Sequence, residues 1–284
     1  MDNKKRYSAD RFGGYGSGKG RAAYSRSTRP AVGGDDMETE NSGIIVGRNA
    51  VRELLRSGRT VDKIFVRKGD REGSIVVLVA QAIEQHIPVV EVDGIKLDKM
   101  AGMTQHQGIV AMTAQKEYSS VEDIIEIARE RGELPLIVIA DGITDPYNLG
   151  AVIRCAEGCG AHGIIIPKRR AVGLTPAVTK ASAGAIEHMA IAKVSNIAAT
   201  VDKLKKLGIW IFAAEAGGQD CFEADFNTPA AIVLGSEGDG VSQLVKDKSD
   251  FIVSIPMYGK VNSFNVSTAA AVILAQAVNY RKKH

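Results

Sequence analysis

Short apolar runs without polar alternation recur through the second half of the chain. They read LIVIAD, GIII, IWIFAA, AAIVL and FIVSI, at 136–141, 163–166, 209–214, 230–234 and 251–255. Unbroken runs of this length are typical of parallel strands that helices cover on both faces. Helical patterns are expected over 120–131, from near Leu149 and over about 266–282. Together these elements predict an α/β domain over residues 117–284.

A shorter pattern of the same kind lies over residues 42–116. The expected elements are a helix, a strand, a helix and two strands, at 48–57, 63–68, 74–86, 89–92 and 108–114. Gly58 ends the first helix, and Pro88 precedes the strand at 89–92. This pattern predicts a smaller α/β domain, in keeping with a length of 284 residues that suggests about two domains.

Residues 1–41 have no apolar periodicity and are rich in glycine, serine and charge, so we expect them to be disordered. The whole chain carries a net charge of +3, yet eight cations against two carboxylates give residues 1–30 alone +6. Four aromatic residues, Tyr7, Phe12, Tyr15 and Tyr24, are interleaved with these cations. Such a segment can bind single-stranded RNA by phosphate attraction and base stacking. A solubilising tail without a partner is the alternative.

Several classes of protein are disfavoured by composition. No apolar run reaches the roughly 18 residues that span a bilayer, and the N-terminus lacks the apolar core of a signal peptide, so we expect a cytoplasmic protein with no membrane partner. Cys155, Cys159 and Cys221 do not suggest a disulfide framework. No other ligands stand at zinc spacing, so no metal is expected.

The first βα turn of the larger domain, DGITDPYNLGAVIR, lacks the G-x-G-x-x-G fingerprint, and no P-loop is present, which argues against a dehydrogenase or an NTPase. Asn148 stands where a helix N-cap belongs. Arg154 follows about two turns later among small apolar residues, where a cation needs a partner. A surface ion pair and a catalytic or phosphate-binding role both remain open.

The segment LGSEGDGVS at 234–242 directly follows a strand. Its glycines, Gly235, Gly238 and Gly240, permit close backbone approach to a ligand, although a sharp turn alone would also use them. Glu237 stands at the carboxyl end of the strand, where α/β sheets place their sites.

The segment SIPMYGKVNSFNVSTAAA at 254–271 places four polar residues where a helix begins: Asn262, Ser263, Asn265 and Ser267. One of them would suffice as a cap. Four predict a polar pocket at the helix N-terminus, able to hold the amino acid part of a ligand.

Taken together, NLGAVIR (148–154), LGSEGDGVS (234–242) and IPMYGKVNSFNVSTAAA (255–271) resemble, in order and spacing, the three motifs of the SpoU ribose methyltransferases. Residues 42–116 are similar in length and pattern to the RNA-binding domain of the ribosomal L30e type that many members carry. The chain is most similar to the bacterial 23S rRNA guanosine ribose methyltransferases. It departs from the family at Phe264, where leucine is frequent.

The resemblance implies an α/β fold of the SPOUT superfamily with a deep trefoil knot in the C-terminal domain, a homodimer, an RNA substrate and S-adenosylmethionine as methyl donor. Residues 42–116 would bind the RNA and residues 117–284 would carry the methyltransferase. The cofactor site implied is Leu234, Gly235, Glu237, Gly238, Ile255, Met257, Ser263, Phe264, Asn265 and Ser267.

The resemblance also implies that Arg154, Asn148, Glu237 and Asn265 catalyse attack of a ribose 2′-hydroxyl on the methyl group. A guanidinium is a poor base, so Arg154 either activates the hydroxyl or stabilises the developing charge. Two alternatives stay open: a tRNA ribose methyltransferase of the same family, and an rRNA-binding factor whose catalytic half is inactive.

Overall fold

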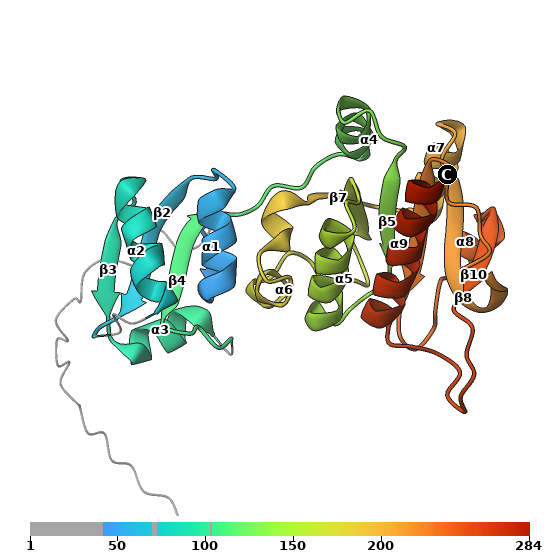
Figure 1. Ribbon diagram of the computed structural model, residues 1–284. Helices are drawn as coiled ribbons and strands as arrows, with labels where there is room; N and C mark the ends of the chain where they lie inside the picture. Colours follow the sequence, from blue (N-terminus) through green and yellow to red (C-terminus); the bar gives the residue numbers. More distant parts are fainter. Residues whose placement is uncertain (1–41, 70–72, 103) are drawn as a thin grey trace, which may run out of the picture. The chain divides into compact units, whose positions relative to one another are not determined.

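The computed structural model describes residues 42–69, 73–102 and 104–284 (Figure 1). The expected disordered tail at 1–41 lies outside these residues. The first sheet has four strands in the order β1-β4-β2-β3, with β2 and β3 parallel and β4 antiparallel to β1 and β2. Its elements are β1 (Ser42–Val46), α1 (Arg48–Arg56), β2 (Val61–Arg67), α2 (Ser74–Glu84), β3 (Val89–Val92), α3 (Gly94–Ala101) and β4 (Ile109–Ala114).

Alternate residues of this small sheet enter two separate cores. Ile64 and Ile109 pack with α1 and α2 on one face, whereas Phe65 and Val110 pack with Leu97 of α3 on the other. The sequence pattern did not predict β1 or α3. Strand β1 is five residues long and begins beside the tail, and α3 buries only Leu97 and Ala101, so neither produces a clear periodicity.

The second sheet has six parallel strands in the order β10-β8-β9-β5-β6-β7, which confirms the predicted α/β class. The strands are β5 (Leu136–Asp141), β6 (Gly163–Pro167), β7 (Ala190–Val194), β8 (Trp210–Asp220), β9 (Ala230–Gly235) and β10 (Phe251–Ser254). Strand β8 extends beyond the predicted 209–214, because its end pairs with β10 after a register shift. Strand β7 was not predicted; it lies at the edge of the sheet and carries Lys193, which breaks the apolar run.

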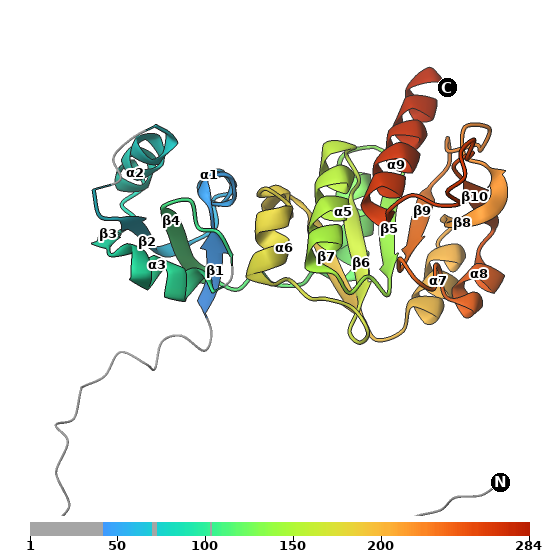
Figure 2. The ribbon, with the colours of Figure 1, turned by 90° about the horizontal axis from the view of Figure 1, so that it is seen from below.

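Helices cover both faces of this sheet (Figures 1 and 2). In β5, Val138 and Ala140 face α5 (Pro146–Gly158) and α9 (Val266–Lys283). Ile137 and Ile139 face the other layer, which comprises α4 (Val121–Glu130), α7 (Ile197–Lys206) and α8 (Gln243–Lys248). The short helix α6 (Pro176–Ala181) and the 3₁₀ turn Ala185–His188 connect β6 to β7. Helices α6, α7 and α8 were not predicted.

Helix α9 is fixed at both of its ends. At its start, the Asn265 side chain accepts from the Ser267 backbone N–H at 2.9 Å and caps the helix. Near its end, the Arg281 guanidinium donates to four backbone carbonyls, those of Leu134, Pro135, Phe226 and Thr228, at 2.6–2.9 Å. These carbonyls precede β5 and β9, so Arg281 joins the helix to the amino edge of the sheet.

The carboxyl ends of the parallel strands meet at the opposite edge, and the loops that follow β5, β6, β8, β9 and β10 all leave from there. Residues 255–265 form the loop that leads into α9 (Figure 2). No helix in the described part of the chain is long and apolar enough to cross a membrane.

Candidate active site

The start of α5 differs from the sequence prediction. Asp145 is the N-cap, since its side chain accepts from the Tyr147 N–H at 2.7 Å, and Pro146 occupies the first helical position. Asn148 is therefore inside the first turn and does not cap the helix, which was the structural role that its position in the sequence suggested. Relieved of capping, its nearly buried side chain, 9% exposed, is available for other contacts.

Asn148, Glu237 and Asn265 form a closed polar network, although 89 and 28 residues separate them along the chain. Asn148 Nδ2 donates to Glu237 Oε1 at 2.8 Å, and Asn265 Nδ2 donates to Asn148 Oδ1 at 3.0 Å. Asn265 Nδ2 also donates to Glu237 Oε1. We call these three side chains the amide–carboxylate triangle. It unites one residue from each of the three sequence motifs.

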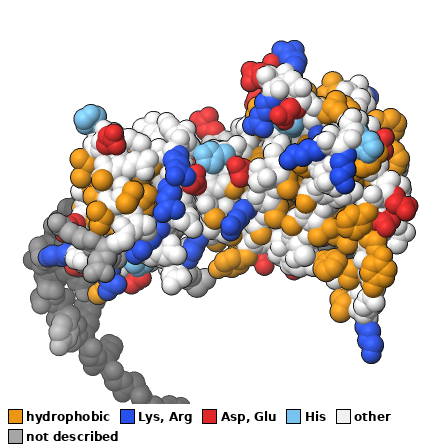
Figure 3. Space-filling model, viewed as in Figure 1, with side chains coloured by type: hydrophobic (Ala, Val, Ile, Leu, Met, Phe, Trp, Pro, Cys, Tyr) orange, Lys and Arg blue, Asp and Glu red, His pale blue; other side chains and the backbone are white. Residues whose placement is uncertain are grey.

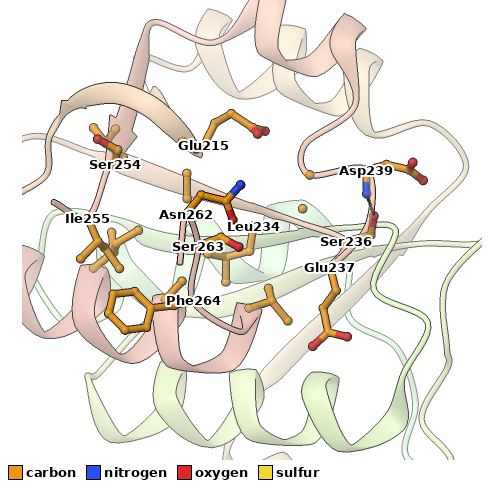
Figure 4. Close-up of a pocket in the computed structure, with 18 of the residues that line it drawn as sticks. Glu215, Leu234, Ser236, Glu237, Asp239, Ser254, Ile255, Asn262, Ser263 and Phe264 are labelled. Carbon is orange, nitrogen blue, oxygen red and sulfur yellow. Dashed lines mark hydrogen bonds between the residues drawn. The ribbon is translucent and has the colours of Figure 1, made fainter. Parts of the chain in front are cut away.

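Within this triangle, Glu237 Oε1 accepts both amide bonds, and Glu237 Oε2 has no partner among the described residues. Two donors on one oxygen fix the orientation of the carboxylate and leave the second oxygen directed outward as an acceptor. Figure 4 shows the Glu237 side chain pointing toward α5, away from Glu215 on the far side of the cavity. The arrangement can receive a hydroxyl proton or hold a hydroxyl group in place.

Two glycines of the 234–242 segment are needed to close its turn. Ser236 and Gly240 exchange a pair of backbone hydrogen bonds at 3.1 Å. A Cβ on Gly235 would lie 2.0 Å from the Gly240 carbonyl carbon, and Gly240 has a φ of +66°. A Cβ on Gly238 would meet nothing within 4 Å. The turn therefore explains Gly235 and Gly240, and Gly238 is open to the cavity.

Glu215 was missed by the sequence analysis. It follows the apolar run of β8, and Glu215 Oε2 accepts from the Val241 N–H at 3.0 Å, which holds the end of the glycine turn. Lys246 lies 3.6 Å from the same oxygen. The only signal in the sequence is a carboxylate directly after the apolar run at 209–214, which lies inside β8.

A cavity of about 320 Å³ opens between these loops (Figure 4). Eight of the ten residues predicted for the cofactor line it: Leu234, Gly235, Glu237, Gly238, Ile255, Met257, Ser263 and Phe264. The other two, Asn265 and Ser267, are engaged at the cap of α9, where Ser267 Oγ donates to Asn265 Oδ1 at 2.6 Å. Glu215, Glu237 and Asp239 also line the cavity and no described Lys, Arg or His does, so the site suits a cationic ligand.

The loop that leads into α9 exposes several large apolar side chains. Tyr258 is 96% exposed, Val261 67% and Phe264 46%. Figure 3 shows apolar side chains gathered around this loop. Phe264 lines the cavity as well, so this side chain contacts both the cavity and solvent.

Arg154 lies on α5, exposed, six residues after Asn148. Six residues place it about 9 Å farther along the helix axis and on a different face. No described residue forms an ion pair or hydrogen bond with its guanidinium, so the surface ion pair considered above is not seen in the described chain. The structure thus brings together three of the four predicted catalytic residues and leaves Arg154 apart from them.

The cysteines are free, with Cys221 buried and Cys155 and Cys159 partly buried. Burial raises the pKa of all three thiols. Among the described residues, no group of three or more His, Cys, Asp or Glu side chains could hold a metal ion.

Comparison with known proteins identifies the family of the chain. Residues 135–275 match the sequence model of the SpoU rRNA methylase family, and residues 44–119 match that of the RNA 2′-O ribose methyltransferase substrate-binding domain. A putative TrmH family tRNA/rRNA methyltransferase of Bacillus subtilis is 44% identical over 241 residues, which cover 84% of this chain and 96% of the relative.

Two solved structures have a similar fold. The SpoU methyltransferase AviRb of Streptomyces viridochromogenes, in complex with AdoMet, has a TM-score of 0.71 at 22% identity, covering 86% of this chain and 92% of its own. A putative RNA methyltransferase of the TrmH family from Porphyromonas gingivalis has a TM-score of 0.66 at 25% identity, covering 86% and 91%.

Proposed function

The chain belongs to the SpoU, or TrmH, family of RNA methyltransferases, and from this premise we propose that it transfers a methyl group from S-adenosylmethionine to a ribose 2′-hydroxyl of RNA. The substrate we propose is a guanosine of bacterial 23S rRNA. The observation that carries the activity is the amide–carboxylate triangle, which joins the three motifs beside a cavity that residues of the second and third motifs line.

The cavity residues fit S-adenosylmethionine. The cofactor supplies a methyl group on a positively charged sulfonium. Three carboxylates line the cavity and no described Lys, Arg or His does, although Lys246 lies 3.6 Å from Glu215 outside the lining. Ile255, Met257 and Phe264 add the apolar surface that an adenine ring requires, and Gly238 allows close approach of the backbone.

Glu237 and the two asparagines have a positioning role in this proposal. The ribose hydroxyl donates to Glu237 Oε2, the oxygen that Asn148 and Asn265 leave open. A hydroxyl held in this way can be aligned with the methyl carbon, and alignment supplies a large part of the rate gain in transfer reactions. The carboxylate also accepts the proton more readily than a guanidinium could.

Arg154 stabilises charge in this scheme. Its guanidinium is exposed and without an ion-pair partner among the described residues, so it can bind the phosphate of the target nucleotide and lower the energy of the forming alkoxide. Its distance along α5 from Asn148 supports a site completed by two copies of the chain. We therefore propose a homodimer in which the RNA contacts both subunits.

The remaining predictions about domains belong to the same proposal. Residues 42–116 select the RNA, residues 117–284 bind the donor and catalyse, and residues 1–41 add an auxiliary RNA contact. The trefoil knot implied by the resemblance stays a prediction. An inactive rRNA-binding factor is disfavoured, because a factor without catalysis would have no need of an intact triangle.

The decisive experiment incubates the protein with methyl-labelled S-adenosylmethionine and, separately, ribosomal RNA and total tRNA, then maps the labelled nucleotide. We expect label in one ribose of 23S rRNA. Label confined to tRNA would replace the substrate and keep the reaction. Absence of label in every RNA, with calorimetry showing no donor binding, would contradict the proposal. Calorimetry with NAD and ATP is the control and should give no heat.

A further inference from the structure

Three consecutive cations follow β6 in the loop that leads to α6. Lys168, Arg169 and Arg170 are all exposed. None of their side chains forms an ion pair or a hydrogen bond with a described residue. We call them the β6 cluster. Adjacent like charges repel one another, so a cluster that forms no ion pair with a described carboxylate has an energetic reason to bind an anion.

The loop that carries the β6 cluster is fixed on both sides. The Lys168 N–H donates to the Val194 carbonyl at 2.7 Å, and the Val172 N–H donates to the Ile143 carbonyl at 3.1 Å. Between these bonds, Arg170 adopts a left-handed backbone with a φ of 58°. That conformation costs a non-glycine residue on the order of 1 kcal/mol, so the surrounding bonds hold the cations in a defined place.

The cluster lies next to the active-site loop. A Cβ built on Gly142, just after β5, would come within 3.9 Å of the Arg170 carbonyl oxygen and within 3.9 Å of Ser236 Cβ. Gly142 is thus flanked by the β6 loop on one side and by the glycine turn on the other. Ser236 directly precedes Glu237, so the loop that carries the cations and the turn that carries Glu237 flank the same residue at the carboxyl edge of the sheet.

We propose that the β6 cluster binds backbone phosphates of the substrate RNA beside the target nucleotide, an inference that rests on the function proposed above. Two of its members are arginines, whose planar guanidinium matches a phosphate in a bidentate manner. The signs of charge are separated between neighbouring loops: carboxylates line the cavity for a cationic donor, and the β6 loop carries cations for an anionic strand. The methyltransferase domain would thereby have an RNA-binding surface of its own.

The test removes three charges by the substitutions Lys168→Gln, Arg169→Gln and Arg170→Gln in the full chain. If three phosphate contacts to a single strand are lost, the slope of log affinity against log salt becomes shallower by about two, and affinity at 0.1 M salt falls roughly 100-fold. RNA affinity is measured by filter binding over a range of salt. Donor affinity, measured by calorimetry, should not change, because none of the three lines the cavity.

A matched control removes the same charge from the amino edge. Lys206, Lys282 and Lys283 are exposed, form no ion pair with a described residue, and lie at the ends of α7 and α9. Their triple replacement by Gln should leave the salt slope nearly unchanged. Equal effects of the two triple variants on RNA affinity would overturn the proposal, as would an unchanged slope in the first.

Folding is controlled separately. Arg170→Gly removes a charge while suiting the positive φ, so it should weaken RNA binding without loss of thermal stability. If the protein methylates no RNA but binds RNA through the β6 cluster, the proposed function is contradicted and the inference about the cluster is kept. If the triple variant Lys168→Gln, Arg169→Gln, Arg170→Gln methylates RNA and its RNA affinity is unchanged, the proposed function stands and the RNA contact of the β6 cluster is contradicted.

Discussion

Arg281 provides the clearest test of how this fold holds its last helix. Its guanidinium donates to four carbonyls at 2.6–2.9 Å, and burial lowers the pKa of the group. Arg281→Met keeps an unbranched side chain and removes every donor. Hydrogen bonds to a charged group contribute about 1.5–3 kcal/mol each, but desolvation of the guanidinium and rehydration of the freed carbonyls offset much of the sum.

We therefore expect a loss of about 3 kcal/mol in the free energy of unfolding. For a domain of this size, that loss corresponds to a decrease of roughly 6–12 °C in melting temperature. The chain contains one tryptophan, Trp210 in β8, so its fluorescence reports unfolding of the larger domain alone. Urea titration followed at this residue avoids the complication of a second domain.

Lys282→Met is the matched control, since the neighbouring cation is exposed and forms no ion pair with a described residue. Arg281→Lys should recover only part of the stability, because an ammonium cannot reach four carbonyls with the geometry of a planar fork. If Arg281→Met and Lys282→Met differ by less than about 0.5 kcal/mol, within the usual scatter of surface substitutions, the four bonds do not stabilise the domain and the reasoning fails.

Three further predictions concern the site, the tail and pH. Arg154→Ala should remove nearly all turnover and leave donor affinity and melting temperature unchanged; ordinary turnover would exclude a catalytic role, and rescue by Lys would favour simple charge stabilisation. Deletion of 1–41 should lower RNA affinity and make its salt dependence shallower, whereas an unchanged slope would mean a solubilising tail. His162 is buried with its pKa lowered by desolvation, and its Nδ1 accepts from the Leu136 N–H at 3.0 Å, so the folded state needs the neutral ring. Unfolding free energy should therefore fall as pH drops below about 6.5, the ordinary pKa of the unfolded residue, and His162→Gln should flatten that decline.

The six-stranded sheet could be predicted largely from sequence, because central strands that are covered on both faces must be apolar throughout. Five of its strands were expected. Strand β7 was not predicted because it is an edge strand and tolerates a lysine that a fully covered strand would not. Lys193 extends over the Tyr118 ring, with its Nζ 4.8 Å from the ring centroid. The periodicity of apolar residues arises from burial, so an element that buries few residues produces only a weak periodicity.

The site was predictable in its members and less so in its geometry. The motifs named Asn148, Glu237 and Asn265, yet nothing in their spacing indicates that one oxygen of Glu237 accepts both amides. The local sequence also suggested Asn148 as a helix cap. Asp145 takes that position instead and is followed by Pro146, which suits the first turn. Glu215 could not be found, since its importance depends on Val241, 26 residues away.

Asn265 has a consequence for how such a protein can change over evolutionary time. Its Oδ1 caps α9, and its Nδ2 belongs to the triangle, so a single amide serves two requirements at once. Aspartate or serine could satisfy the helix, but neither supplies the two N–H donors that Asn265 gives to Asn148 and Glu237. A lineage that abandoned catalysis could keep a stable helix with either residue. Asparagine at this position therefore meets a requirement of the triangle that the folding of α9 alone does not impose.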